Sequence, residues 1–249
     1  MKKLFLLLTI ACATVAFAEN QTLFSIDFEE GEGFTAGSVT GQVGWTDLAW
    51  WVGTHSFVIA DESGAQSGSQ YLHVAEDGDS NANQQNNTID ISEEYTEGMK
   101  LLLHGWAKAD FTGTAPLSIR FHCLGTSGKG YDVEIAEFNF QHDGTGNAYV
   151  SGKNLTFEGL TQGVYYEFGV RIDPSTKTVE KVFVGENSYE GEGMTYKSAT
   201  AEGCGNLPDG IRVYNGKGCL DNFKIDVVPE PAFLGLLAIA GLFFVRKQR

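Results

Sequence analysis

Short runs of alternating apolar and polar residues recur along this chain, and clusters of Gly, Asn, Asp and Ser separate them. Phe24, Ile26 and Phe28 illustrate the period of two, which is typical of a strand with one face in the core. Between the two terminal segments, no stretch of sequence keeps the 3.6-residue apolar period of an amphipathic helix. The sequence therefore predicts an all-β fold.

The predicted strands extend over most of the chain. They are Thr22–Phe28, Trp45–Trp51, Ser56–Ala60, Tyr71–Val74, Thr88–Ile91, Met99–Lys108, Leu117–Leu124, Tyr131–Phe140, Val164–Ile172, Thr178–Val184, Ile211–Tyr214 and Leu220–Val227. The segment Glu76–Asn87 is rich in Asn, Asp and Gln, and we expect a polar loop there. Because no Pro- or Ser-rich linker divides residues 19–227, these strands predict a single β-sandwich or barrel domain.

Several of these strands resemble those of laminin-G-like, concanavalin-type jelly rolls. Leu101–Lys108 matches the family's run of apolar residues, Trp, any residue and Lys. Val164–Gly185 is similar to its Asp-Pro hairpin, with Tyr165 in place of the usual Trp, and Gly68–Val74 and Leu220–Ile225 are similar to the second and last strands. The resemblance implies a jelly-roll β-sandwich. Its members include lectins, polysaccharide-binding modules, hydrolases, lyases and structural domains, so this fold does not identify a function.

The N-terminal segment has the three parts of a secretory signal peptide. Lys2 and Lys3 form its basic start, and Leu4–Val15 its apolar centre. Ala16 and Ala18 form a small-x-small cleavage site. We therefore expect residues 1–18 to direct export and then to be removed.

The C-terminal segment combines a break, an apolar run and a basic tail. Pro229 and Pro231 stop regular structure, because each fixes φ and lacks a backbone donor. Residues 232–245 carry no polar side chain, which predicts a helix with lipid on every face, although the run is shorter than the roughly 20 residues of a comfortable span. The cations Arg246, Lys247 and Arg249 predict a cytoplasmic end.

This order of parts over residues 228–249 resembles the PEP-CTERM sorting signal of Gram-negative bacteria. The resemblance implies that Pro229-Glu230-Pro231 is recognised by an exosortase, a protease of the inner membrane. It also implies that the domain is membrane-anchored first and then resides in the cell envelope, at the surface or in the extracellular matrix. An ordinary C-terminal membrane anchor is the alternative.

The chain is acidic, with 17 basic and 32 acidic residues and a formal net charge of −15. The two terminal segments hold five of the basic residues and one acidic residue, so the domain between them is more acidic still. Such a surface repels nucleic acid and anionic lipid head groups. It therefore argues against nucleic-acid binding and is compatible with divalent cations.

Three cysteines lie in the predicted domain, and export permits disulfides. Cys204 and Cys219 flank a short segment with Gly, Asn and Pro that is able to fold back, so they are the candidate disulfide. Cys123 is then left as a buried apolar residue. No Cys or His spacing resembles a zinc site.

One predicted strand holds the candidate catalytic residues. Asp132, Glu134 and Glu137 resemble the Glu-x-Asp-x-x-Glu strand of laminarinase-type glycoside hydrolases, in which paired carboxylates serve as nucleophile and acid/base. Asp and Glu are exchanged at the first two positions, which draws the nucleophile back by a methylene, and catalysis depends on placement at that scale. In a regular strand Glu137 also shares the core face with Val133 and Ile135 unless a bulge intervenes.

The resemblance also implies a metal. In several sugar-binding jelly rolls a structural Ca²⁺ lies between the first and last strands, and the matching positions here are Asp27 or Glu29 and Asp221. The alternative is that Asp221 only accepts backbone hydrogen bonds. A second oxygen-rich segment, Asp77–Asn81, suits either Ca²⁺ or a turn.

Tryptophans are the candidate sugar-stacking residues. Trp50 and Trp51 are adjacent, so in a strand they face opposite ways and one of them is available to a sugar ring. A core role for both and for Trp45 is the alternative. Trp106 lies in an apolar run and is expected in the core.

These observations predict an exported, non-catalytic surface or matrix protein with polysaccharide as its candidate ligand. The alternative is a glycan-cleaving enzyme, a glycoside hydrolase or lyase, on the same jelly roll. A purely structural domain needs no site and is the third interpretation.

Overall fold

The computed structural model describes residues 21–47, 56–74, 83–110, 112, 115–123, 133–201 and 203–228. The predicted signal peptide, the sorting signal with its helix over 232–245, Asp132, and Trp50 and Trp51 lie outside these ranges. Within them, no helix is long and apolar enough to cross a membrane.

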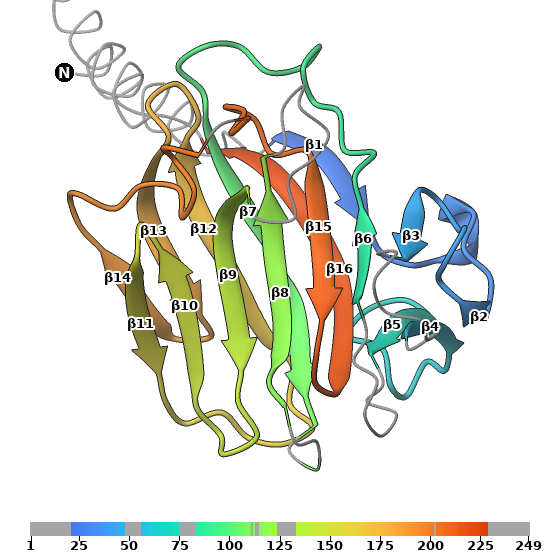
Figure 1. Ribbon diagram of the computed structural model, residues 1–249. Coiled ribbons are helices and arrows are strands. Elements are labelled where there is room, and N and C mark those ends of the chain that lie inside the picture. Colours follow the sequence, from blue (N-terminus) through green and yellow to red (C-terminus); the bar gives the residue numbers. More distant parts are fainter. Residues whose placement is uncertain are drawn as a thin grey trace, which may run out of the picture.

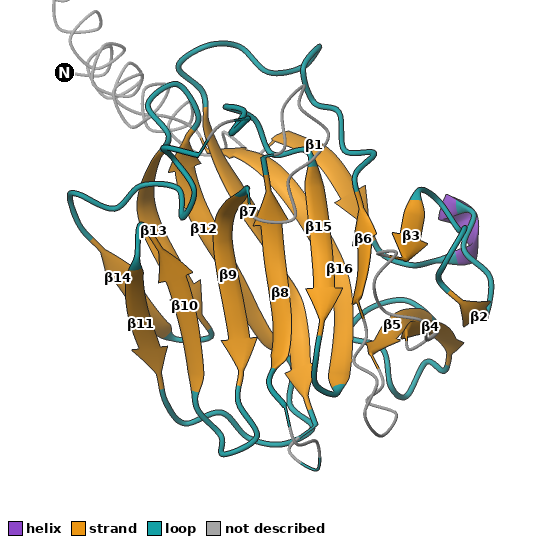
Figure 2. Cartoon of the chain, viewed as in Figure 1, coloured by secondary structure: helices purple, strands orange, loops and turns teal. Residues whose placement is uncertain are grey.

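The described residues form a sandwich of two antiparallel sheets, with one short 3-10 helix, η1 (Glu30–Glu32) (Figures 1 and 2). The nine-stranded sheet runs in the order β14 (Asn187–Glu190), β13 (Thr178–Val184), β12 (Tyr166–Asp173), β7 (Lys100–Ala109), β16 (Gly218–Val228), β5 (Gln70–Val74), β4 (Ser56–Ala60) and β2 (Gly37–Ser38), with β1 (Gln21–Ile26) also paired to β16. The seven-stranded sheet runs in the order β11 (Lys153–Phe157), β10 (Gly146–Val150), β9 (Glu134–Phe140), β8 (Leu117–His122), β15 (Gly210–Tyr214), β6 (Asn83–Asn86) and β3 (Trp45–Asp47). The prediction of an all-β sandwich is confirmed.

Consecutive strands alternate between the two sheets at the centre of the molecule. β5, β7 and β16 belong to the nine-stranded sheet, and β6, β8 and β15 to the other, which is the connectivity of a jelly roll. The step from β15 to β16 is a tight turn in which Asn215 and Gly216 have φ of 55° and 58°. Asn and Gly tolerate this left-handed conformation best, which is why Asn-Gly suits the turn.

Aromatic rings from both sheets meet in the core. Phe121 of β8 stacks on Phe168 of β12 with ring centres 5.8 Å apart and planes inclined by 12°. Phe223 of β16 lies 5.4 Å from Phe121, and Phe138 of β9 lies 5.1 Å from Phe168. Such pairs add roughly 0.5–1.5 kcal/mol each to the burial of their area, so they hold the two sheets in one relative position.

Part of the predicted polar loop is a strand. The last residues of the segment 76–87 form β6, where Gln84 and Asn86 are buried. Gln84 Nε2 donates to Thr40 Oγ1 (2.9 Å) and Asp47 Oδ1 (3.0 Å), and Asn86 Nδ2 donates to the Val43 carbonyl (2.8 Å). The loop prediction fails there because hydrogen bonds, rather than apolar contacts, compensate the burial of these side chains.

Other sequence predictions also change. Strands β10, β11 and β14 were not predicted. The side chains of β11 and β14 are largely polar, whereas β10 is a short strand in which buried Ala148 and Val150 alternate with Asn147 and Tyr149. Residues 88–91 are not a strand, although Ile89 and Ile91 are buried. Trp45 is a core residue with no exposed area. Trp106, in contrast, was predicted in the core but lies on the outward face of β7, opposite the face on which Leu103 and Ala107 are buried.

Candidate functional site

Polar side chains cross the open face of the seven-stranded sheet in two parallel rows. Strand pairing places the members of each row opposite one another on successive strands. The first row contains Gln85, Arg212, Arg120, Glu137, Tyr149 and Asn154; the second contains Tyr214, Ser118, Asn139, Asn147 and Thr156. We call them the polar rows. No described helix or strand lies over this face between β9 and β15 (Figure 1).

A β-bulge in β9 brings Glu134 and Glu137 to this open face. Phe121 of β8 pairs with Ala136, but the next residue of β8 pairs with Glu134, so Ile135 is an extra residue in β9. Ile135 and Ala136 are both buried, and the alternation resumes on either side of them. The regular-strand expectation, with Glu137 on the core face, is therefore wrong.

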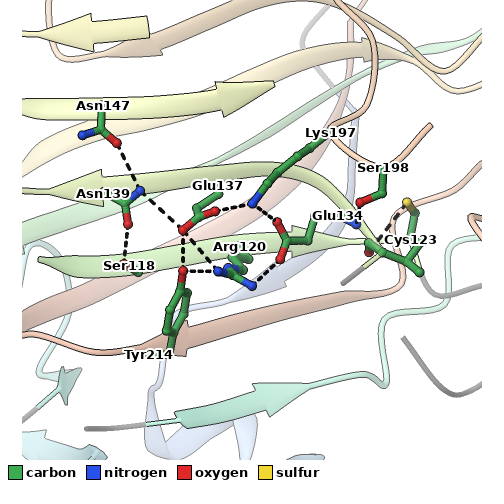
Figure 3. Close-up of polar contacts among 11 residues, drawn as sticks. Ser118, Arg120, Cys123, Glu134, Glu137, Asn139, Asn147, Lys197, Ser198 and Tyr214 are labelled. Carbon is green, nitrogen blue, oxygen red and sulfur yellow. Dashed lines mark hydrogen bonds and ion pairs between the residues drawn. The ribbon is translucent and has the colours of Figure 1, made fainter. Parts of the chain in front are cut away.

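The two carboxylates share two cations (Figure 3). The guanidinium of Arg120 donates to Glu134 Oε1, and its Nη2 lies 3.3 Å from Glu137 Oε1. Lys197 Nζ lies 2.5 Å from Glu134 Oε2 and also contacts Glu137 Oε2. One ammonium thus touches both carboxylates, which places them side by side.

Lys197 reaches this cluster from a loop. Its backbone N–H donates to the Ile135 carbonyl (2.9 Å), and the next N–H, of Ser198, donates to the Glu134 carbonyl (2.9 Å). Ser198 Oγ in turn accepts from the Glu134 N–H at 3.0 Å. The loop therefore binds the edge of the bulge by three hydrogen bonds.

Tyr214 and Asn139 complete the cluster. The Tyr214 hydroxyl donates to Glu137 Oε1, and its ring centre lies 4.1 Å from the Arg120 guanidinium carbon. Asn139 Nδ2 donates to Asn147 Oδ1 at 3.1 Å, and its Oδ1 accepts from Ser118. Residues of four neighbouring strands are thus connected by hydrogen bonds.

The two carboxylates differ in acidity. Burial raises the pKa of Glu134 above its ordinary value, against the opposing charges of Arg120 and Lys197. Burial acts in the same direction on Glu137, but hydrogen bonds from Lys197 and Tyr214 and the charge of Arg120 outweigh it and lower the pKa of Glu137. Burial also raises the pKa of Tyr214, so its hydroxyl keeps its proton.

A groove of about 450 Å³ opens over the second polar row. Its lining comprises Pro116, Ser118, Glu137, Asn139, Gln141, Tyr149, Lys197, Tyr214 and Asn215. Glu134 does not line it, because only 2% of that side chain is exposed, against 28% of Lys197. The groove therefore presents hydroxyl, amide, carboxylate and ammonium groups together with two tyrosine rings.

Sequence reasoning found Glu134 and Glu137 but missed their neighbours. Asp132 lies outside the described residues, so the predicted triplet is not assembled here. Arg120 had a weak signal, since it stands between inward-facing Ile119 and Phe121 in an apolar strand. Lys197 had none, because 60 residues separate it from Glu137.

The predicted calcium ligands do not all meet. Among the residues that the structure describes, no three His, Cys, Asp or Glu side chains are grouped to hold a metal. Glu29 accepts hydrogen bonds from the N–H groups of Ser69 (2.6 Å) and Gln70 (2.9 Å), so its carboxylate stabilises the start of β5. Asp27 and Asp221, in contrast, converge on one residue, Ser67.

Asp221 is fully buried in a bulge of β16, where Asn222 has a φ of 51°. Its Oδ2 accepts from Gln66 N (2.8 Å) and its Oδ1 from Asn222 N (2.9 Å). Burial raises the pKa of Asp221 to about 7, and the nearby Asp27 adds to the shift despite these hydrogen bonds. Neither carboxylate forms an ion pair with a described Lys, Arg or His. The two acids and Asn222 Oδ1, which no described group satisfies, are oxygen donors of the kind that Ca²⁺ takes.

The structure does not bring Cys204 to Cys219. None of the three described cysteines is bonded to another, and Cys204 Sγ instead lies 3.1 Å from Cys123 Sγ. Cys219 is buried in β16 between His73 and Lys108 of the neighbouring strands. The chain between Cys204 and Cys219 does not fold back as a short loop. It forms β15 of the seven-stranded sheet before it reaches Cys219 in β16 of the nine-stranded sheet.

No protein-family model and no curated protein sequence match the chain. Solved structures with similar strand arrangements include the catalytic domain of a glycoside hydrolase family 131 protein from Coprinopsis cinerea, with 14% identity, a TM-score of 0.47, and coverage of 85% of this chain and 95% of that one. The CBM22-1 xylan-binding domain from Paenibacillus barcinonensis has 15% identity and a TM-score of 0.39, with 86% and 99% covered. A sialidase has 10% identity and a TM-score of 0.47, and this chain covers 19% of its length.

Proposed function

We propose that this protein is a non-catalytic polysaccharide-binding domain whose ligand lies along the polar rows. The supporting observation is the continuity of these rows across successive strands on a face that no described strand or helix covers. From Arg212 to Asn154 the first row crosses five strands, or about 19 Å at a strand spacing of about 4.8 Å. That length suits several linked sugar units rather than one.

The chemistry of the groove fits sugar hydroxyls. The carboxylate of Glu137 accepts from hydroxyl groups, the Lys197 ammonium donates to them, and the Asn139 amide does both. Tyr149 and Tyr214 provide rings of amphipathic character beside these polar groups. A few directed polar contacts beside aromatic surface are typical of small-molecule and glycan sites.

The ion pairs favour binding over cleavage. A glycosidase needs one carboxylic acid that still holds its proton at the working pH. The lowered pKa of Glu137 opposes that role. The raised pKa of Glu134 suits it better, but Glu134 is nearly inaccessible and both of its oxygens contact cations.

A glycan-cleaving enzyme is the second candidate, and the bulge in β9 is the observation that favours it. It brings Glu134 and Glu137 to one face, as the resemblance to laminarinase-type hydrolases requires.

A panel of polysaccharides separates the two candidates. The purified full chain is run through affinity gels that contain each polysaccharide, and the same mixtures are assayed for new reducing ends and unsaturated ends. Retardation without new ends supports the binding domain. New ends that disappear in Glu137→Gln establish the enzyme, and absence of both retardation and cleavage leaves the structural interpretation.

We further propose that the domain is exported and sorted by a PEP-CTERM system, with the inner membrane and an exosortase-type protease as partners. This proposal is supported by the sequence of both termini. Intact masses of the protein from envelope and culture fluid test it: cleavage after Ala18 and loss of the residues beyond Pro231 support it, and a full-length protein in the cytoplasm contradicts it.

We also propose that Asp27, Asp221 and Asn222 hold a structural Ca²⁺. When bound, the ion would neutralise two carboxylates that both accept a hydrogen bond from Ser67. It would thereby join the end of β1 to the bulge in β16.

A further inference from the structure

The thiols of Cys123 and Cys204 are in contact although 81 residues separate them. Cys123 follows the last residue of β8 and is fully buried, whereas Cys204 is partly exposed. The backbone holds both in place: Gly205 N donates to the Cys123 carbonyl at 2.7 Å, and Lys177 Nζ donates to the Cys204 carbonyl at 2.7 Å.

We propose that Cys123 and Cys204 are the site of an intramolecular disulfide that fastens the Lys197 loop to the end of β8. A disulfide bond is about 2.0 Å long, so the two sulfurs, now 3.1 Å apart, must approach by about 1 Å. The bond closes a long loop, the case in which a cross-link restricts the unfolded chain most.

The oxidation proceeds by exchange with a disulfide, either a small molecule or an oxidoreductase. The more accessible Cys204 thiolate attacks the oxidant, breaks its S–S bond and releases one thiol. The Cys123 thiolate then attacks Cys204 Sγ and displaces the second thiol. Two protein thiols are oxidised by two electrons, and the oxidant is reduced to two thiols. Burial raises the pKa of Cys123, so its attack is the slower step.

The disulfide would also hold Lys197 in its position between Glu134 and Glu137. Lys197 and Ser198 belong to the same loop as Cys204, and their N–H groups donate to the bulge in β9. A covalent attachment at Cys204 therefore holds the segment that places Lys197 between Glu134 and Glu137. Reduction would free that segment at one end.

The full chain, isolated from an oxidising compartment, is alkylated in denaturant without reduction and digested with trypsin. Cleavage at Arg212 and Lys217 puts Cys204 and Cys219 in different peptides. We expect one cross-link, between the peptides that contain Cys123 and Cys204, with Cys219 alkylated. A Cys204–Cys219 cross-link, or three alkylated cysteines, overturns the proposal.

Hydrogen exchange tests the role of the link independently of any glycan. Exchange at the amides of Lys197 and Ser198 should rise several-fold on reduction and in Cys204→Ser, while the matched variant Cys219→Ser keeps both the cross-link and the slow exchange. A cross-link whose loss leaves these amides unchanged contradicts the fastening role.

Discussion

Glu134 and Glu137 point to the same side of β9, although a regular strand would place residues three apart on opposite faces. The extra residue in β9 produces this arrangement and exposes Glu137 to the groove while Glu134 stays beneath Lys197. One bulge therefore creates both a buried ion-pair cluster and the polar surface above it.

Removal of the Glu137 charge should destabilise the fold. The lowered pKa of Glu137 indicates that the fold favours its ionised form, and in Glu137→Gln both Arg120 and Lys197 lose a largely buried counter-charge, which costs about 3 kcal/mol or more. Glu180→Gln is the matched control, because Glu180 also contacts two cations, Lys100 and Arg171, but its side chain is 24% exposed. We expect less than about 1 kcal/mol there. Urea unfolding at pH 8 measures both, and equal losses would contradict the importance of burial.

Much of the fold was predictable because apolar alternation decides it. Strand β7 lies where the sequence predicts a strand, and its Leu101, Leu103 and Ala107 are buried in alternation, although Trp106, which was predicted in the core, takes the outward face. Strand β6 escaped this reasoning, because Gln84 and its neighbours are buried by hydrogen bonds rather than by apolar contact.

The site was only half predictable. The adjacent apolar pair Ile135-Ala136 between two glutamates is the local signal of a bulge, since a regular strand does not bury two consecutive side chains on one face. The contribution of Lys197 depends on tertiary structure alone. The disulfide prediction had the same limit: it used proximity in sequence, whereas the fold brings Cys204 to Cys123.

Tyr149 should contribute to glycan affinity. Its ring lines the groove, and removal of a central aromatic contact typically costs more than about 1 kcal/mol, or close to tenfold in Kd. Tyr149→Ala should therefore weaken binding about tenfold on affinity gels or in calorimetry. Trp106→Ala is the control, because Trp106 lies on the outward face of β7, in the other sheet. Loss of binding in both variants, or in neither, would place the ligand elsewhere.

Asp221 should make stability depend on pH. Its pKa is about 7 in the folded protein, against an ordinary value of 3.8, so between these values the unfolded chain binds fewer protons than the folded one. In the presence of a chelator, stability should fall as pH rises from about 4 to about 7, by about 1 kcal/mol per pH unit from this group. Asp221→Asn should remove that component. Unfolding curves at several pH values for both proteins measure it, and parallel pH profiles would show that Asp221 is not the group responsible.

Calcium should offset the loss of stability that the ionisation of Asp221 causes. Millimolar Ca²⁺ should raise the Tm of the full chain at pH 8, because a ligand that binds only the folded state stabilises it by mass action. The rise should be smaller at pH 5, where protonated Asp221 competes with the ion, and smaller with Mg²⁺, which prefers a tighter octahedral site. Asp221→Asn should abolish the shift. Asp61→Asn should retain it, since the Asp61 carboxylate accepts its hydrogen bonds from Ser63 in the same loop. Equal shifts in the two variants would mean that calcium binds at another place, and no shift in the unmodified chain would mean that Asp27 and Asp221 hold no metal.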